Sequence, residues 1–139
     1  MNERRKVEVW IYRPDGQYLV LLLTPERGGF WQPVTGSVEP GEKIEAAALR
    51  EATEETGLTF LNPVESLDSD FVFESRGEVF REHGFALKAP PTGKIRLDPD
   101  EHVAFRWVSA EEALKLMRFP ENAAMLKLLL KRQTTGASS

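Results

Sequence analysis

The feature that most constrains this chain is a predicted helix with carboxylates on the face expected to pack against the rest of the protein. Residues 43–56 are rich in Ala, Glu, Leu and Arg and are followed by Gly57, a pattern typical of a helix closed by a glycine. At about 100° per residue, Glu51 and Glu55 fall about 20° on either side of Ile44 on the helical wheel. An ordinary surface helix places its acids opposite the apolar stripe, so these two carboxylates are predicted to lie along the packed face.

The same region holds the whole net charge of the chain. Six acids and two bases lie between Glu39 and Glu55, which gives −4, and the full sequence has 18 Lys and Arg against 22 Asp and Glu, also −4. The clustered carboxylates are those of Glu42, Glu51, Glu54 and Glu55. Neighbouring carboxylates on a helix repel one another, and a single Arg50 cannot neutralise them all. Either the helix is a solvated Glu-rich surface, or a cation compensates it. Because the chain has no Cys and the segment no His, we expect a hard ion, Mg²⁺ or its substitute Mn²⁺.

Composition and length limit the remaining choices. At 139 residues, 41% hydrophobic and 29% charged, the chain fits one globular domain spanning 1–139, with a frayed tail expected at 133–139. No apolar run approaches the roughly 20 residues needed to span a bilayer, and no signal peptide core is visible, so we expect a cytoplasmic protein. The net negative charge argues against broad nucleic-acid binding and leaves a small phosphorylated molecule as the expected partner. Monomer and homodimer both remain open.

Apolar periodicity predicts strands that alternate with helices in a mixed order. Strands are expected at 7–13, 18–23, 30–34, 71–73, 78–88 and 102–108, with a hairpin turn at 75–77. Besides the acidic helix, one helix is expected to open at a capping box over 109–112 and another to cover 121–132. The predicted class is α/β (α+β), with helices on both faces of a mixed sheet.

The acidic segment also carries a long spaced motif. Gly36 is followed after five residues by Glu42 and, after seven more, by a run from Arg50 to Leu58 that reads REATEETGL. This resembles the Nudix box, GX5EX7REUXEEXGU, where U is apolar, and all seven fixed positions match. The resemblance covers 23 residues, and the order of elements outside them is also similar to the Nudix fold, an α/β/α sandwich around a mixed sheet.

The resemblance implies a Mg²⁺-dependent hydrolase of nucleoside diphosphates linked to another group. It makes Glu51, Glu54 and Glu55 metal ligands or residues that position a metal-bound water. It makes the backbone carbonyl of Thr35 an additional ligand. Arg50, counted with the catalytic set, and Glu42 are expected to brace the loop and the helix. Gly36 is expected to permit a tight loop, and Gly57 to end the helix.

Three stretches outside the box bear on the substrate. Residues 30–39, FWQPVTGSVE, are similar to the run that enters the box in bacterial dihydroneopterin triphosphate (or dATP) pyrophosphohydrolases, which suggests substrate contacts for Phe30, Trp31 and Gln32. Residues 101–108 resemble a run of the same group, which implies that Glu101 is a metal ligand or the catalytic base. Residues 80–87 resemble the strand that faces the site, which suggests substrate contacts for Arg81 and Glu82.

The sequence thus predicts a Mg²⁺-dependent pyrophosphohydrolase that cleaves dihydroneopterin triphosphate or a (deoxy)nucleoside triphosphate such as dATP to the monophosphate and pyrophosphate. A dinucleoside polyphosphate or nucleotide-sugar hydrolase is the alternative within the class, and a non-catalytic Nudix-fold nucleotide-binding module is the alternative outside it. Three simpler interpretations stay open. Phe30 and Trp31 are core aromatics, residues 4–6 form a solvated tail rather than a phosphate contact, and His83 and His102 are structural.

Overall fold

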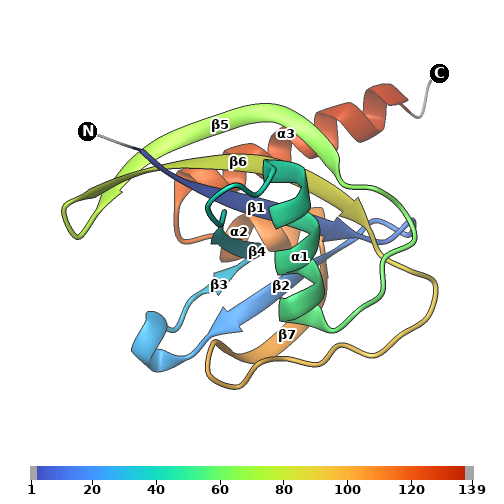
Figure 1. The fold of residues 1–139 in the computed structure, drawn as a ribbon. Coiled ribbons are helices and arrows are strands. Elements are labelled where there is room, and N and C mark those ends of the chain that lie inside the picture. The colour runs from blue at the N-terminus through green and yellow to red at the C-terminus, as the bar shows by residue number, and fades with distance from the viewer. Residues whose placement is uncertain (1–2, 137–139) are drawn as a thin grey trace.

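The structure of the protein is a computed structural model that describes residues 3–136. Over these residues a seven-stranded sheet is covered by α1 (Ile44–Thr56) on one face and by α2 (Ala110–Leu116) and α3 (Pro120–Gly136) on the other (Figure 1). The predicted α/β/α sandwich is therefore confirmed.

The strands are β1 (Arg4–Tyr12), β2 (Gln17–Leu23), β3 (Trp31–Gln32), β4 (Val34–Ser37), β5 (Glu65–Ser75), β6 (Glu78–Lys88) and β7 (His102–Ser109), and η1 (Pro25–Arg27) is a 3₁₀ turn. Within the described part, no helix is both long and apolar enough to cross a membrane.

Strand β1 runs through the middle of the sheet and positions the site. The strand order is β3-β2-β1-β6-β5, with β4 beside β1 and β7 beside β2, and β1 pairs in parallel with β6 while the other pairs are antiparallel. The mixed sheet is thus confirmed. In the first half of β1, Lys6 lies opposite Glu82 of β6, and Glu8 lies opposite Thr35 of β4. Side chains from three strands therefore meet around Lys6 and Glu8.

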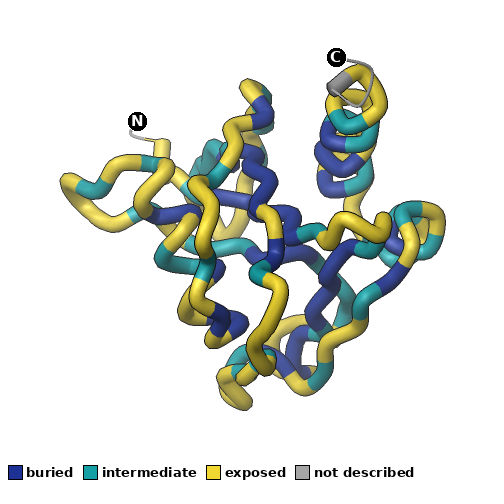
Figure 2. Tube along the Cα trace, turned by 90° about the vertical axis from the view of Figure 1, so that its right-hand side faces the viewer, coloured by how far each residue is buried: buried dark blue, intermediate teal, exposed yellow. Residues whose placement is uncertain are grey.

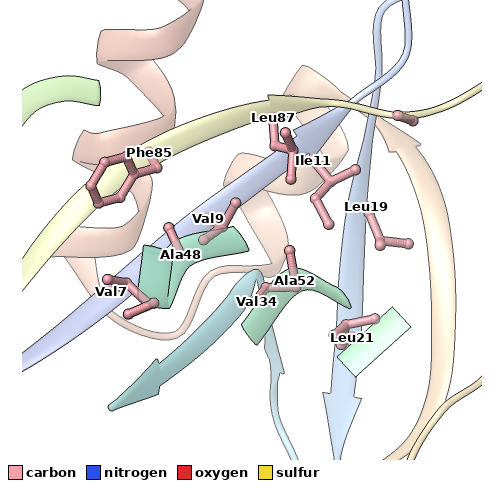
Figure 3. Packing of buried hydrophobic residues seen from close by; sticks show 12 residues of the cluster. Val7, Val9, Ile11, Leu19, Leu21, Val34, Ala48, Ala52, Phe85 and Leu87 are labelled. Carbon is pink, nitrogen blue, oxygen red and sulfur yellow. The ribbon is translucent and has the colours of Figure 1, made fainter. Parts of the chain in front are cut away.

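Two hydrophobic cores form because both faces of the sheet are covered. Val7, Val9 and Ile11 alternate along β1 and pack toward α1 in the core shown in Figure 3. Trp10 points to the opposite face and packs with residues of α2 and α3, such as Leu126. The central strands are accordingly buried while most connecting loops are exposed (Figure 2). A polar residue on either face of β1 is therefore buried and needs a partner.

Three segments differ from the sequence prediction. β1 already begins at Arg4, because residues 4–6 pair with β6, so these residues form a strand and not a tail, although Arg4 and Arg5 are exposed to solvent as predicted. β5 is far longer than 71–73, because it follows β6 across a bulge whose carbonyls at 66 and 67 accept hydrogen bonds from Arg132. α3 continues through Gly136 where a frayed tail was expected from 133, and the Tyr18 hydroxyl donates to Gln133 on this last turn. Residues 137–139 of that tail lie outside the described residues.

Gly57 ends α1 in the left-handed conformation, with φ of 71°, and its N–H donates to the Thr53 carbonyl. Replacing Gly57 by Ala is expected to lower the free energy of unfolding by about 1–2 kcal/mol, because an L-residue is strained there. Urea unfolding of the two proteins measures the difference. Gly57→Asn is the matched control and should lose less, since Asn tolerates this conformation. Equal losses in both variants would instead point to the contact with Arg96, whose Cβ lies 3.0 Å from the added Cβ.

Candidate active site

Glu51 and Glu55 project from the packed face of α1, as the helical wheel predicts. Ala47 and Ala48 on the same face are fully buried and allow the helix to approach the sheet closely. The Glu55 residue is 1% exposed and the Glu51 side chain 14%. Glu54 lies off this face, and its side chain is 59% exposed. The sequence thus places two of its clustered carboxylates in the interior.

Gly36 on β4 makes room for the Glu51 carboxyl. A Cβ added to Gly36 would lie 2.0 Å from Cδ of Glu51, which is far inside contact distance. The carboxyl group therefore rests directly on the backbone of β4, and a larger residue at position 36 would require Glu51 or β4 to move. This close approach fixes where the Glu51 oxygens stand relative to Thr35, the neighbouring residue of the strand.

Arg50 ties the helix to the loop that precedes it. Its Nε and Nη2 donate to the two carboxylate oxygens of Glu42, over 2.8 and 3.0 Å, and Nη2 also donates to the carbonyl of Ser37 over 2.9 Å. Nη1 donates to Glu51 over 3.1 Å and to Glu54 over 3.2 Å. The Arg50 guanidinium lowers the pKa of the Glu42 carboxyl, and Glu42 in turn raises that of Arg50. One guanidinium thus holds the Glu51 carboxylate in a fixed frame.

Glu51 and Glu55 face a hollow of about 360 Å³ that we call the acidic cavity. Its lining includes Arg27, Gly36, Glu51, Glu55, Glu101 and His102. Oε1 of Glu55 and both ring nitrogens of His102 are buried without a hydrogen-bond partner. Buried polar atoms are nearly always satisfied in folded proteins, so a group bound in the cavity would supply partners that these atoms lack.

Glu55 is held protonated in this environment. Burial, followed by the adjacent Glu51 carboxylate, raises the pKa of Glu55 to about 10. Burial lowers the pKa of His102. The 3.9 Å separation between Glu55 Oε1 and His102 Nε2 therefore joins two neutral groups near neutral pH and is not an ion pair. Burial also raises the pKa of Glu101, although Arg27, 3.9 Å from it, works against this shift.

A hard divalent cation fits this donor set. Between residues 3 and 136, no three His, Asp or Glu side chains are already arranged as a metal cage. Mg²⁺ seldom uses such a cage, because it is usually held by one or two carboxylates together with waters and substrate phosphates. Glu51 and Glu55 supply that pair, and the unpartnered Oε1 of Glu55 is an oxygen that a cation would satisfy. A bound cation would also favour the ionised form of Glu55.

A second hollow, of about 400 Å³, lies beside the first and is called the aromatic cavity. Its walls include Phe71, Phe73 and Phe119, and its polar lining includes Glu82, Glu121 and Asn122. Lys6, Gln32 and Thr35 line both cavities, so the two hollows adjoin at these residues. Gln32 Nε2 donates to the Thr35 hydroxyl over 3.2 Å at this junction. The arrangement suits a molecule with a flat apolar part at one end and a charged part at the other.

The structure brings most of the predicted site residues together, but not all. Glu51, Glu55, Glu101, Gln32, Thr35 and Glu82 all line one or both cavities. Glu54 does not line the acidic cavity and instead pairs with Arg50. Arg81 precedes Glu82 on β6 and points to the opposite face of the sheet, so it lines neither cavity and instead binds Glu3 and Asp70.

The two aromatic residues predicted as substrate contacts take supporting positions. Trp31 packs against the core beneath α2 and α3, with the Arg106 guanidinium 5.7 Å from its ring centre. Phe30 meets Phe119 edge to face, with ring centres 5.4 Å apart. Phe30 thus braces a wall of the aromatic cavity without lining it.

Sequence reasoning did not single out several cavity residues. From sequence, Lys6 is expected in a solvated tail rather than at a phosphate and His102 is expected to be structural, yet both line the acidic cavity. Phe119, just before α3, and Asn122, in its first turn, are far from the motif in sequence. Glu8 was visible as one acid among the apolar residues of β1, and a central strand covered on both faces was the signal that this acid is buried.

Comparison with known proteins identifies the wider group. Residues 2–129 match the NUDIX domain. The octanoyltransferase of Myxococcus xanthus is 42% identical over 111 residues, which cover 76% of this chain and 30% of that protein's length. The asymmetrical bis(5'-nucleosyl)-tetraphosphatase of Mus musculus is 33% identical over 122 residues, covering 84% of this chain and 82% of that one. The dihydroneopterin triphosphate diphosphatase of Escherichia coli K12 is 32% identical over 123 residues, covering 79% and 81%.

Solved structures agree with this grouping. The dihydroneopterin triphosphate pyrophosphohydrolase of E. coli superimposes with a TM-score of 0.74 at 28% identity, covering 88% of this chain and 92% of that one. An Ap4A hydrolase of C. elegans superimposes with a TM-score of 0.81 at 24% identity, covering 95% and 98%, which supports the fold alone.

Proposed function

The chain belongs to the NUDIX domain family and is a hydrolase acting on phosphoric anhydride bonds, and from that premise we propose that it cleaves a free triphosphate to the monophosphate and pyrophosphate. The proposed substrate is dihydroneopterin triphosphate or a (deoxy)nucleoside triphosphate. The observation that supports it is that the two cavities adjoin at Lys6, Gln32 and Thr35. A ring bound between Phe71 and Phe119 would direct its phosphates past Lys6 into the acidic cavity. If the substrate is the pterin, the reaction is an early step of folate synthesis.

The proposal includes Mg²⁺, held by Glu51 and Glu55, with Glu101 and the Thr35 carbonyl as further candidate ligands. Bound there, the ion would neutralise phosphate oxygens and lower the pKa of a bound water. The protein's own groups complete the site. Arg27 and Lys6 place positive charge at the wall and at the junction of the acidic cavity. Glu101 is partly exposed at the cavity and is the candidate to accept the proton of the attacking water.

A dinucleoside polyphosphate hydrolase is the second candidate, because the mouse relative carries that name. Such a substrate has a second nucleoside beyond the phosphates, whereas a free triphosphate ends in them. A nucleotide-sugar hydrolase differs from the proposed enzyme in the same respect, because its substrate carries a sugar beyond the phosphates. A non-catalytic binding module is the third candidate, and the buried Glu51–Glu55 pair argues against it because two adjacent buried acids are costly for a protein that needs no cation there.

A product assay separates the candidates. Dihydroneopterin triphosphate, dGTP, dATP, diadenosine tetraphosphate and ADP-ribose are each incubated with the protein and Mg²⁺, and the products are separated by ion-exchange chromatography. We expect pyrophosphate from a triphosphate at a kcat/KM at least about tenfold above that for the other classes, since the cavities match one ring and one phosphate chain. Glu51→Gln is the inactive control, and Glu78→Gln, on exposed β6 surface, is the matched active one.

Two results would contradict the proposal. Preferred release of ATP and AMP from diadenosine tetraphosphate would favour the second candidate. No turnover of any substrate, with Mg²⁺ binding shown by calorimetry, would favour the binding module. A requirement for Mn²⁺ in place of Mg²⁺ would change the ion and leave the reaction standing.

Location and assembly complete the proposal. We place the enzyme in the cytoplasm, which cell fractionation followed by immunoblotting would test. Its working state is a monomer or a homodimer, and light scattering coupled to size-exclusion chromatography gives the mass that decides between them.

A further inference from the structure

Two buried carboxyl groups, those of Glu8 and Glu82, lie side by side next to the aromatic cavity, which Glu82 lines. Glu8 and Glu82 stand on neighbouring parallel strands, where Glu82 pairs with Lys6 and Glu8 pairs with Gly84, which has no side chain. Both acids point to the face that carries α2 and α3, because Val7 and Val9 point to the other. Glu8 is 0% exposed and Glu82 5%. The activity described above uses neither group, so their burial calls for another reason.

Glu8 is fully committed to neighbouring side chains. Its Oε2 accepts a hydrogen bond from Trp10 Nε1 and its Oε1 accepts one from Asn122 Nδ2, each over 2.7 Å. The second bond sets the orientation of the Asn122 amide, because the nitrogen must face Glu8. The amide oxygen of Asn122 is then left as an acceptor, and Asn122, 8% exposed, lines the aromatic cavity.

Glu82 is the member of the pair that faces the cavity. It lines the aromatic cavity together with Lys6, which lies opposite it in the strand register, whereas Glu8 is enclosed by Trp10 and Asn122. Burial raises the pKa of both carboxyl groups, so the two share a proton rather than ionise together. The Lys6 ammonium favours the negative charge on Glu82. Glu82 therefore presents its carboxylate oxygens to the cavity.

A carboxylate and an amide oxygen between aromatic walls form a specific surface. Both groups accept hydrogen bonds, so a flat ligand must supply N–H donors at this edge, and two adjacent donors match the two oxygens of one carboxylate. We propose that Glu82 and Asn122 select a substrate whose ring carries a cyclic guanidine edge, a ring N–H beside an exocyclic amino group, with Glu8 as their positioning residue. This edge occurs in 2-amino-4-oxopteridines and in guanine. The inference rests on the proposed function, since it names the ring of the proposed triphosphate.

The same requirement for two adjacent N–H donors excludes adenine. Its corresponding edge has an exocyclic amino group beside an unprotonated ring nitrogen, and that nitrogen would face the Glu82 carboxylate, acceptor against acceptor. One hydrogen bond to a charged group is lost and one lone-pair repulsion is gained. A preference of about 10²-fold for the guanidine edge is expected from the usual strength of such bonds.

Binding of two nucleoside monophosphates and of neopterin, an unphosphorylated pterin, to wild-type protein tests this without any turnover. GMP, AMP and neopterin are titrated separately into the protein by calorimetry, and weak binders are followed by saturation-transfer NMR. We expect GMP and neopterin to bind and AMP to bind about 10²-fold more weakly than GMP. Tighter binding of neopterin than of GMP assigns the site to pterins, because neopterin lacks the phosphate that GMP carries. Equal affinity for GMP and AMP, or tighter binding of AMP, would overturn the inference.

A single isosteric change supplies the second test. In Glu82→Gln the new amide offers one donor and one acceptor, which suits the adenine edge and opposes the guanidine edge. The GMP-over-AMP ratio is expected to fall by at least about tenfold, mostly through tighter AMP binding. A purely structural role of Glu82 would weaken both ligands alike and leave the ratio unchanged. Glu78→Gln is the control, because it makes the same change on the exposed part of β6, where Glu78 pairs with Arg4.

The outcomes for this inference and for the proposed function can be told apart. If triphosphates are hydrolysed to pyrophosphate but guanine and adenine are treated alike, only the inference fails. If GMP and neopterin bind selectively and no triphosphate is hydrolysed, only the proposed reaction fails. If none of the three ligands binds, the inference fails whatever the assay shows. Wild-type binding decides the matter even if Glu82→Gln does not fold.

Discussion

Replacing Glu55 by Gln is expected to reduce kcat/KM by about 10²–10³-fold, the range seen when one group that stabilises charge in a transition state is removed. The same change is expected to raise the free energy of unfolding of the metal-free protein. Both effects follow from burial, since Glu55 is 1% exposed, lies against Glu51 and has one oxygen without a partner. Gln keeps the shape of the side chain and removes the charge that a cation needs. A loss of activity together with a gain in stability distinguishes a metal site from an ordinary buried acid, whose replacement would change stability alone.

The pH dependence of the free energy of unfolding also reports the burial of Glu55. The pKa of Glu55 is about 10 in the folded state against an ordinary 4.5, so the folded state binds one more proton between these values. The stability of the metal-free wild type therefore falls as pH rises above 4.5, by about 1.4 kcal/mol per unit of pH for one whole proton. Urea unfolding in EDTA from pH 5 to 8 measures the slope, which Glu55→Gln should reduce.

The control for this pair of measurements is Glu54→Gln, because the Glu54 side chain is 59% exposed. Its stability should follow the wild-type pH curve. The Glu8–Glu82 pair adds a slope of the same sign to all three proteins and cancels from the comparison. Parallel curves for wild type and Glu55→Gln, or activity that survives the change, would remove Glu55 from the proposed metal site.

The α1 residues of the acidic cavity could be predicted from sequence, because their arrangement depends only on spacing within one helix. Helical periodicity places Glu51 and Glu55 on one face from spacing alone, and Ala47 and Ala48 show that this face is packed. The fold class followed from the alternation of strand and helix patterns for the same reason. The same spacing turns Glu54 away from that face, and its side chain is accordingly exposed and pairs with Arg50.

The aromatic cavity depends on contacts between segments that are distant in sequence. Asn122 meets Glu8 across 114 positions of the sequence, and no periodicity reports such a contact. The pairing register of β6 determines which of its side chains enter the cavity, because Arg81 and Glu82 are adjacent in sequence and point to opposite faces of the sheet. A strand pattern without a paired register could not say which of the two enters the cavity. The same parallel register places Lys6 beside Glu82 and so inside the site.

Replacing Gly36 by Ala is expected to lower kcat/KM by about 10²-fold and the free energy of unfolding by about 1–3 kcal/mol, the usual range for overpacking a tight interior. The added Cβ would overlap Cδ of Glu51 at 2.0 Å, so either the carboxyl group moves or β4 does. Gly36 is not in the left-handed region, so backbone strain contributes nothing and the whole effect comes from this contact. Activity assays and urea unfolding measure the two losses.

A double-mutant cycle shows whether Glu51 is the group displaced. Glu51→Ala removes the overlapping atoms, so Gly36→Ala should cost much less stability in that background than in the wild type, with a coupling energy of about 0.5–3 kcal/mol. The double variant should remain inactive, because the carboxylate that the glycine accommodates is gone. Additive losses in stability would mean that β4 gives way instead of Glu51. In that case the glycine would serve the strand and its pairing with Val7, and the fixed position of the Glu51 carboxyl would need another cause.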